Sequence, residues 1–291
     1  MNRNLVFVLG GLLVTPAMAE PVDETTDAAS DGHVDIYNTA GSITVRGWSQ
    51  DSVQVTGELG DDVDELVLER DGDDILVKVK VPRHHGRDID SDITVNVPEN
   101  SSIEVSGVSA DIDVEDVNGD QSLQTVSGDV AAMGVSADLE AASVSGDVEV
   151  TGTGEGGETS AATVSGDVFA SDLAGDLEAE SVSGDVTVAG GSFDRVYFET
   201  VNGDLNFTAE LRGGGKLAAE SVNGDVDIEF DGEVSASFDI ETFNGEIDNC
   251  FGPKPERTSR YTPGLELSFL ESDGNGRVVV ETLNGDVSIC K

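Results

Sequence analysis

A five-residue motif, Val-Ser-Gly-Asp-Val or a close variant of it, recurs along most of this 291-residue chain. Its glycines follow one another at intervals of 18 to 21 residues, with a final interval of 40. A repeat of roughly twenty residues that is rich in β-formers and glycine is typical of a β-solenoid, in which each repeat forms one coil. The motif glycines are Gly128, Gly146, Gly166, Gly184, Gly203, Gly224, Gly245 and Gly285.

Apolar residues recur two and four positions after each motif glycine and five positions before it, with mostly polar residues between them. This period-two pattern indicates two short strands per coil, each with one buried face. We therefore predict an all-β fold, a right-handed parallel β-helix with coils of about 18–21 residues. Val148, Val168 and Val186 should contact one another on successive coils, in a narrow core with few aromatic side chains. Each motif glycine is expected to supply a turn with φ above zero.

Residues 1–19 have the pattern of a secretory signal peptide. Arg3 is followed by the apolar run Leu5–Val14 and by small residues that predict cleavage between Ala19 and Glu20. The sequence therefore predicts a periplasmic or secreted protein. No later segment approaches the roughly eighteen apolar residues of a membrane-spanning helix, so no membrane span is expected.

The rest of the chain divides into parts by composition. An acidic stretch without apolar periodicity is predicted to be a disordered linker, and a region with strand-like runs is predicted to cap the solenoid. The regular repeats follow, and a segment with three prolines is expected to form an insertion loop. The predicted boundaries are 20–32 for the linker, 33–100 for the N-terminal β cap, 101–291 for the solenoid and 252–264 for the insertion loop.

The chain has a formal net charge of −44 at pH 7. Such a surface repels phosphate groups, which argues against nucleic acid or an anionic membrane as a partner. It favours cations or basic partners, or it serves only to keep the protein soluble. We expect the partner to be a cell-envelope protein or a glycan, with divalent cations as a further option.

Two cysteines, Cys250 and Cys290, each stand five residues after a motif glycine. If the segment between them formed two coils, their α-carbons would lie about 9.6 Å apart, beyond the reach of a disulfide. If it formed one long coil with an insertion, the α-carbons would lie about 4.8 Å apart, which fits a disulfide. We predict the single coil and the disulfide, which suits an oxidising compartment. Two free buried thiols are the alternative.

Polar side chains also form columns in the alignment. We expect the hydroxyl column, three positions before the glycine, to bond the turn backbone or the next coil, with a water-ordering face as the alternative. Neighbouring carboxylates about 4.8 Å apart repel by about 0.9 kcal/mol in water, so each must face solvent, accept turn N–H groups or share a cation such as calcium. The hydroxyl column is Thr125, Ser143, Thr163, Ser181, Thr200, Ser221, Thr242 and Thr282; the motif acids are Asp129, Asp147, Asp167, Asp185, Asp204, Asp225, Glu246 and Asp286; a second acidic column is Glu180, Glu199, Glu220, Glu241 and Glu281.

Two features outside the repeats are candidate sites. Trp48, the only tryptophan, is expected to pack in the cap, with a sugar-stacking platform as the alternative. His84 and His85 lie in a basic segment. We expect a solvated loop there rather than a metal site, since no third ligand follows from the spacing.

Several segments occur together with the motif, in a fixed order along the chain. They are GSITVRGW at Gly41–Trp48, Val53–Leu59, Ile75–Pro82, ITVNVP at Ile93–Pro98 and RVVVETLNGDV at Arg277–Val287. With the serial motif, this set resembles the bacterial "putative adhesin" domain family of unknown function. The resemblance implies a cell-envelope β-solenoid with an adhesin-like role, and it brings no catalytic residues.

The sequence contains none of the common nucleophile, zinc or phosphate-binding motifs of enzymes. We therefore predict a non-enzymatic, exported cell-envelope protein without a cofactor, which serves as an adhesin-like binding surface or scaffold. A calcium-binding solenoid is the first alternative, although the nine-residue pattern of calcium-binding β-rolls is missing. A β-helix enzyme that acts on polysaccharides is the second alternative, and it would require a groove with clustered basic residues.

Overall fold

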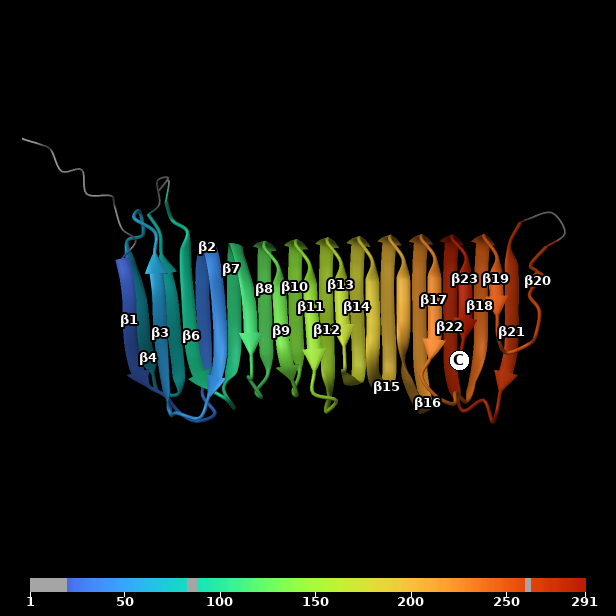
Figure 1. Cartoon of the computed structure of the whole chain (residues 1–291), viewed down its shortest axis with the longest axis horizontal. Helices are drawn as coiled ribbons and strands as arrows, with labels where there is room; N and C mark the ends of the chain where they lie inside the picture. The colour runs from blue at the N-terminus through green and yellow to red at the C-terminus, as the bar shows by residue number, and fades with distance from the viewer. Residues whose placement is uncertain (1–19, 83–87, 260–262) are drawn as a thin grey trace, which may run out of the picture.

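The computed structural model describes residues 20–82, 88–259 and 263–291. All regular structure in these segments is β-strand, so the all-β prediction is confirmed. The strands lie across the long axis of an elongated, solenoid-like stack (Figure 1). No helix able to cross a membrane occurs in these segments. The signal peptide up to Ala19, together with His84 and His85, lies outside the described residues.

Two continuous ladders of parallel strands run along the stack and meet at the motif turns. The strands that precede each motif glycine form the pre-turn face, and those that follow it form the post-turn face. Four long strands bend across both faces: β2 (His33–Trp48), β7 (Ser102–Glu115), β15 (Val186–Asn202) and β16 (Leu205–Asn223). The other pre-turn strands are β8 (Gln121–Ser127), β10 (Leu139–Ser145), β12 (Gly156–Ser165), β14 (Ala174–Ser183), β22 (Gly276–Asn284) and β18 (Ala236–Asn244). The other post-turn strands are β9 (Val130–Val135), β11 (Val148–Gly152), β13 (Val168–Ser171), β17 (Val226–Phe230), β23 (Val287–Cys290) and β19 (Ile247–Asn249).

Equivalent residues of successive repeats lie directly opposite one another on neighbouring strands. Val148 pairs with Val130 on one side and with Val168 on the other, and Val168 pairs with Val186. All four side chains are at most 1 % exposed. The predicted contact between valines of successive coils is therefore confirmed.

The core is less uniform than the repeat suggests. Its early coils are filled by valine and alanine, but phenylalanines fill the space between the two faces in the later coils. Phe207 lies against both Phe193 and Phe198, with ring centroids 6.2 and 6.1 Å apart. The expectation of few core aromatics is therefore wrong for this half of the stack.

The N-terminal region does not stack in chain order. β2 (His33–Trp48) pairs in parallel with β7 on its inner side and with β5 (Asp74–Lys80) and β6 (Ser91–Pro98) on its outer side. The outer edges of β5 and β6 are covered by the antiparallel strands β4 (Glu65–Asp71) and β3 (Ser52–Leu59). The antiparallel strands thus pair with edges that the parallel coils would leave open.

The predicted linker at 20–32 contains strand β1 (Glu20–Asp27), where the sequence suggests disorder. β1 pairs with β3 in antiparallel register along its whole length. Val22 packs against the core, and Asp23 accepts a hydrogen bond of 2.8 Å from the Gln54 amide. An acidic composition suits this position, because charged side chains on an edge strand face solvent and discourage the addition of further strands.

The C-terminal strands are also out of chain order. β22 lies between β16 and β18, and β23 lies between β17 and β19. The last coil of the chain is therefore inserted between two earlier coils, and the C terminus lies inside the stack (Figure 1). The outer edge of β18 is covered by the antiparallel strand β21 (Leu265–Glu271), which pairs in turn with β20 (Glu256–Arg257).

Cys250 and Cys290 form a disulfide, with their α-carbons 4.9 Å apart, so the predicted pairing is confirmed. The predicted stacking order differs, because β23, which contains Cys290, lies on the inner side of β19, the strand that precedes Cys250. Adjacent coils have the same spacing in either order. The spacing argument therefore identified the pair without identifying the order.

Candidate binding surface

The motif turns stack so closely that only glycine fits. A Cβ on Gly146 would lie 2.0 Å from the carbonyl oxygen of Gly128, and one on Gly224 would lie 1.7 Å from that of Gly203. Among the motif glycines only Gly184 has a positive φ, and its value of 159° is nearly extended. The expectation of a left-handed turn residue is therefore wrong, and the glycine column permits the close approach of successive coils.

The hydroxyl column bonds each coil to the preceding turn. Thr163 donates to the carbonyl of Gly146 at 2.9 Å, and Thr200 donates to that of Gly184 at 2.9 Å. These hydroxyls are buried, so the prediction that they bond the turn backbone is confirmed. The alternative, a water-ordering face, would require exposed hydroxyls. Ser221 is the exception, since its buried hydroxyl has no hydrogen-bond partner among the described residues. The same bond to a turn carbonyl is made by Thr125, Ser143, Ser181, Thr242 and Thr282.

The motif acids accept backbone hydrogen bonds from the next coil. The N–H of Asp147 donates to Oδ1 of Asp129 at 2.9 Å, and the N–H of Asp167 donates to Oδ1 of Asp147 at 2.8 Å. The series runs on through the inserted coil to Glu246. Each aspartate in it therefore has a turn N–H to stabilise its charge, as expected for carboxylates that accept turn N–H groups.

We expect millimolar calcium to raise the melting temperature no more than magnesium at matched ionic strength. One oxygen of each motif aspartate is already bonded to a backbone N–H, so these side chains do not need a cation to relieve their charge. The check is a thermal melt followed by circular dichroism in calcium, magnesium and sodium chloride. A rise specific to calcium would favour the calcium-binding alternative.

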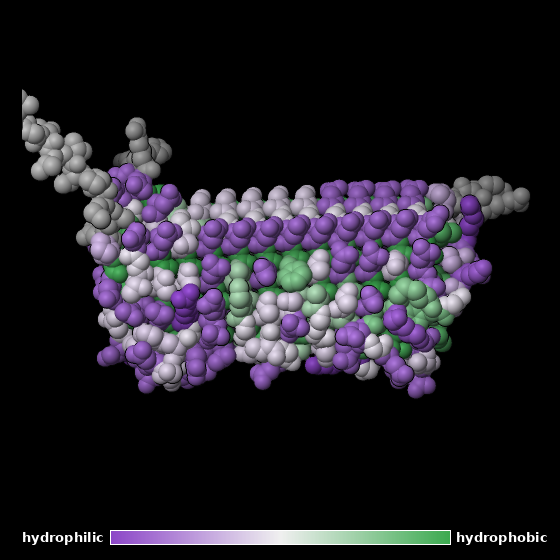
Figure 2. Space-filling view, viewed as in Figure 1, coloured by the Kyte–Doolittle hydropathy of each residue, from purple (hydrophilic) through white to green (hydrophobic). Residues whose placement is uncertain are grey.

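Rows of like side chains follow one long edge of the molecule, where Figure 2 shows continuous hydrophilic rows parallel to the long axis. In the later coils the residue before the glycine is asparagine, and its amide bonds the amide of the next coil. Asn223 donates to Oδ1 of Asn202 at 3.0 Å, and Asn284 donates to Oδ1 of Asn223 at 2.9 Å. The edge is thus ordered by side-chain ladders as well as by the backbone.

An apolar column runs beside these polar rows. It consists of the first residue of each motif, two positions before the glycine, and of Val108 at the equivalent position in β7. The residues that flank this position pair directly across coils. The large apolar side chains that the structure leaves most exposed are mainly of this column, at 38–51 %. We call it the apolar column: Val108, Val126, Val144, Val164, Val182, Val201, Val222, Leu283 and Phe243.

A groove follows the apolar column along the pre-turn face. Its floor is the hydroxyl column and its second wall is formed by glutamates, which we call the glutamate column. The groove has a volume of about 560 Å³ over the later coils, and a smaller part of about 270 Å³ continues toward earlier coils. In stacking order the glutamate column is Glu180, Glu199, Glu220, Glu281 and Glu241.

Burial and neighbouring negative charges raise the pKa values of two carboxyl groups in the glutamate column. Desolvation, followed by the charges of Glu199 and Glu281, raises the pKa of Glu220 above its ordinary value. Desolvation, followed by the charge of Glu178, raises the pKa of Glu180. Tyr197 donates a hydrogen bond of 2.5 Å to Glu199, and this bond is the main cause that raises the pKa of the tyrosine. The column therefore favours any ligand that brings positive charge.

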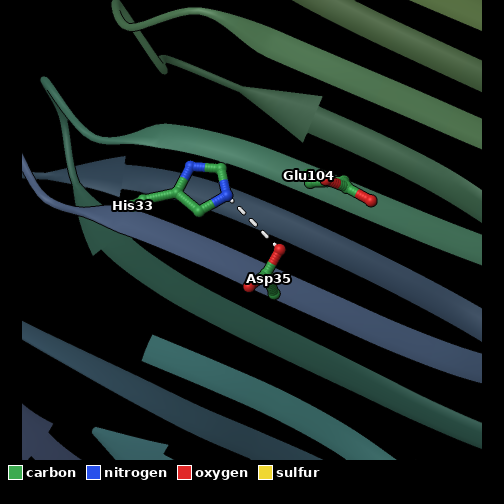
Figure 3. Close-up of side chains that lie close together, drawn as sticks. All are labelled: His33, Asp35 and Glu104. Atoms are coloured by element: carbon green, nitrogen blue, oxygen red, sulfur yellow. Dashed lines mark ion pairs between the residues drawn. The ribbon is translucent and has the colours of Figure 1, made fainter. Parts of the chain in front are cut away.

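A second cluster lies near the N-terminal end, where His33, Asp35 and Glu104 bring atoms able to ligate a metal within 4.8 Å of one another (Figure 3). His33 and Glu104 line a hollow of about 420 Å³. However, Nε2 of His33 lies 3.3 Å from Asp35, and Nδ1 lies 2.9 Å from the Ser102 hydroxyl. Both ring nitrogens are thus engaged by the protein, so the histidine has no free nitrogen directed at a ligand.

Trp48 is half-buried, and its indole N–H donates to the carbonyl of Ser52 at 2.8 Å. This bond fits the prediction of a packed residue better than that of an open sugar platform.

Comparison with known proteins agrees with this architecture. The family model described as Toastrack DUF4097 matches residues 32–290. The chain belongs to this family. The predicted resemblance to adhesin-like domains of unknown function is thereby confirmed, and the Toastrack match includes both out-of-order ends of the stack. Among curated proteins, none shows significant similarity to the chain.

Solved structures that are similar to this Toastrack protein have little sequence in common with it. A protein from Bacteroides fragilis, described as a putative adhesin, is 12 % identical, with a TM-score of 0.50 over 93 % of this chain and 97 % of its own. A protein from Parabacteroides distasonis, described as lipid binding, is 13 % identical over the same shares of both chains, with a TM-score of 0.43. The likeness to the Bacteroides fragilis protein concerns the fold alone.

The apolar column and its groove were not among the predicted sites. The signal was present in the sequence, because the period-two alternation from the buried position five before the glycine places the first motif residue outward. Val144 and Val164 are in that outward phase, yet valine is commonly assigned to the core. The predicted disulfide and glycine column do lie where the motif turns place them, but neither forms a pocket.

Proposed function

We propose that this Toastrack protein is a non-enzymatic, exported cell-envelope protein that binds an extended partner along the groove beside the apolar column. In this proposal the stack is a right-handed parallel β-helix with coils of about 18–21 residues, which matches the strand register. Such a stack offers one repeated contact per coil, so that affinity comes from many weak contacts to a cell-envelope protein or glycan. The predicted signal peptide supports export.

The observation that carries this proposal is the continuity of the apolar column. Soluble proteins rarely expose contiguous apolar surface, and such surface commonly marks an interaction site. Val126, Val144, Val164 and Val182 are 44–48 % exposed on successive coils. The core does not need them, because other columns of each coil fill the space between the two faces.

The walls of the groove argue against a polysaccharide-cleaving enzyme. Such an enzyme would need basic side chains to hold an acidic polymer, whereas this groove is walled by Glu199, Glu220, Glu241 and Glu281. A row of carboxylates repels a polyanionic substrate. The regular repetition of these acids also singles out no acid–base pair.

We expect a triple variant, Val144→Thr with Val164→Thr and Val182→Thr, to lose most partner binding while it keeps its fold. Threonine has the same shape and β-propensity, so only the apolar character of the column changes. The measurement is a quantitative pull-down from envelope extracts with the mature protein. The matched control is Met133→Thr with Phe169→Thr, two exposed apolar residues of the post-turn face. Equal recovery of every captured protein by both variants would contradict the proposal.

A further inference from the structure

The glutamate column is a line of directly paired carboxylates. Glu199 pairs with Glu220, Glu220 with Glu281, and Glu281 with Glu241. Antiparallel pairing extends the line from Glu241 to Glu266. Neighbouring strands lie about 4.8 Å apart, so the line repeats a negative charge at that interval. None of these five has an ion-pair partner among the residues that the structure describes.

The opposite wall of the groove is apolar along the same coils. Val222, Leu283 and Phe243 are 38 %, 48 % and 46 % exposed and face the same groove as the glutamates. A ligand that lies in the groove would thus meet negative charge on one side and apolar surface on the other. It must therefore be amphipathic along its length, with charge repeated at short intervals.

The floor of the groove is closed. The hydroxyls of Thr200 and Thr282 both donate to turn carbonyls of the neighbouring coil. Ser221 is 7 % exposed and lies in the same inward phase, between the outward residues Glu220 and Val222. A ligand in the groove therefore meets the two walls, and it must fit both of them.

We propose that the groove at the glutamate column binds a linear polyamine. Two amines joined by three methylenes stand about 5 Å apart, which is close to the spacing of the strands. Successive ammonium groups can therefore pair with successive glutamates while the methylenes lie against Val222 and Leu283. Phe243 adds a ring face for one ammonium group.

This inference rests on the proposed function, since it names the chemistry of the ligand in the same groove. A divalent metal ion satisfies the carboxylates but makes no use of the apolar wall. A basic peptide strand places same-face side chains about 6.8 Å apart, which does not match the strand spacing. The linear polyamine fits both walls and the interval.

The test is calorimetric titration of the full chain with spermidine, with diaminopropane as a shorter probe. We expect spermidine to bind more tightly than diaminopropane, because it spans more strands. The variant Glu220→Gln with Glu281→Gln should weaken spermidine binding about tenfold or more. This variant should fold, because removing like charges does not remove a stabilising contact.

The matched control is Glu149→Gln with Glu229→Gln, which removes the same charge from exposed positions of the post-turn face. This control should bind spermidine as the wild type does. Equal weakening by both double variants would overturn the proposal, since it would indicate only general attraction to a polyanion. Displacement of spermidine by an equal concentration of magnesium, or binding of a lysine-rich peptide without spermidine binding, would also overturn it. A pull-down that still depends on Val144, Val164 and Val182 would leave the proposed function standing in each case.

Discussion

Gly146→Ala should destabilise the protein by about 3 kcal/mol or more, a large effect for the addition of one methyl group. The new Cβ would lie 2.0 Å from the carbonyl oxygen and 2.5 Å from the carbonyl carbon of Gly128. Both atoms belong to backbone that is bonded into the neighbouring coil, so neither can rotate away. The strain must open the hydrogen bonds between adjacent turns, including that from Asp147 to Asp129.

The measurement is urea denaturation followed by circular dichroism, with Gly156→Ala as the matched control. Gly156 lies ten positions later, and a Cβ there would have no atom within 4 Å. Its replacement should change the free energy of unfolding by about 0.5 kcal/mol or less, because loss of backbone freedom in the unfolded chain is the main effect. A Gly146→Ala variant as stable as the Gly156→Ala variant would contradict the close-approach explanation of the motif.

The repeat predicts the interior of the stack well, for a simple physical reason. Each coil contacts only its neighbours, so the phase of one motif fixes the environment of the next. Val148 and Val168 therefore lie one strand apart, and the hydroxyls of Thr163 and Ser181 bond the preceding turns as expected. The aspartate bonds follow from the same phase.

The ends of the stack could not be predicted in the same way. The strand Gly276–Asn284 carries the same outward and inward pattern as its neighbours, so its sequence fits against β16 as well as against β18. Its place between them depends on β21, which turns back along the outer edge of β18. Contacts between neighbouring coils alone therefore do not determine where this strand is placed in the stack. The groove could likewise not be recognised from the sequence, because its apolar wall consists of the same residue type as the core.

Loss of the disulfide should destabilise the C-terminal end by about 4 kcal/mol in the chain-entropy estimate for a loop of 40 residues. The bond ties Cys250, which follows the short strand β19, to Cys290 of the inserted strand β23. Among the described strands, β19 has a partner on one side only, whereas β18 and β23 are paired on both. β19 should therefore open first, while β23 keeps its pairing with β17.

Hydrogen exchange measured by mass spectrometry separates these two regions. In the variant Cys250→Ala with Cys290→Ala, the amides of Ile247–Asn249 should exchange much faster than in the oxidised wild type, while those of Leu139–Ser171 should be unchanged. Reduced wild type should match the variant, and reductant should not alter the variant further. Uniform acceleration along the whole stack would contradict local opening, because it would mean that the disulfide stabilises all coils together. Local opening instead follows from a stack whose last post-turn strand, β19, pairs with β23 alone among the described strands and is followed directly by the disulfide.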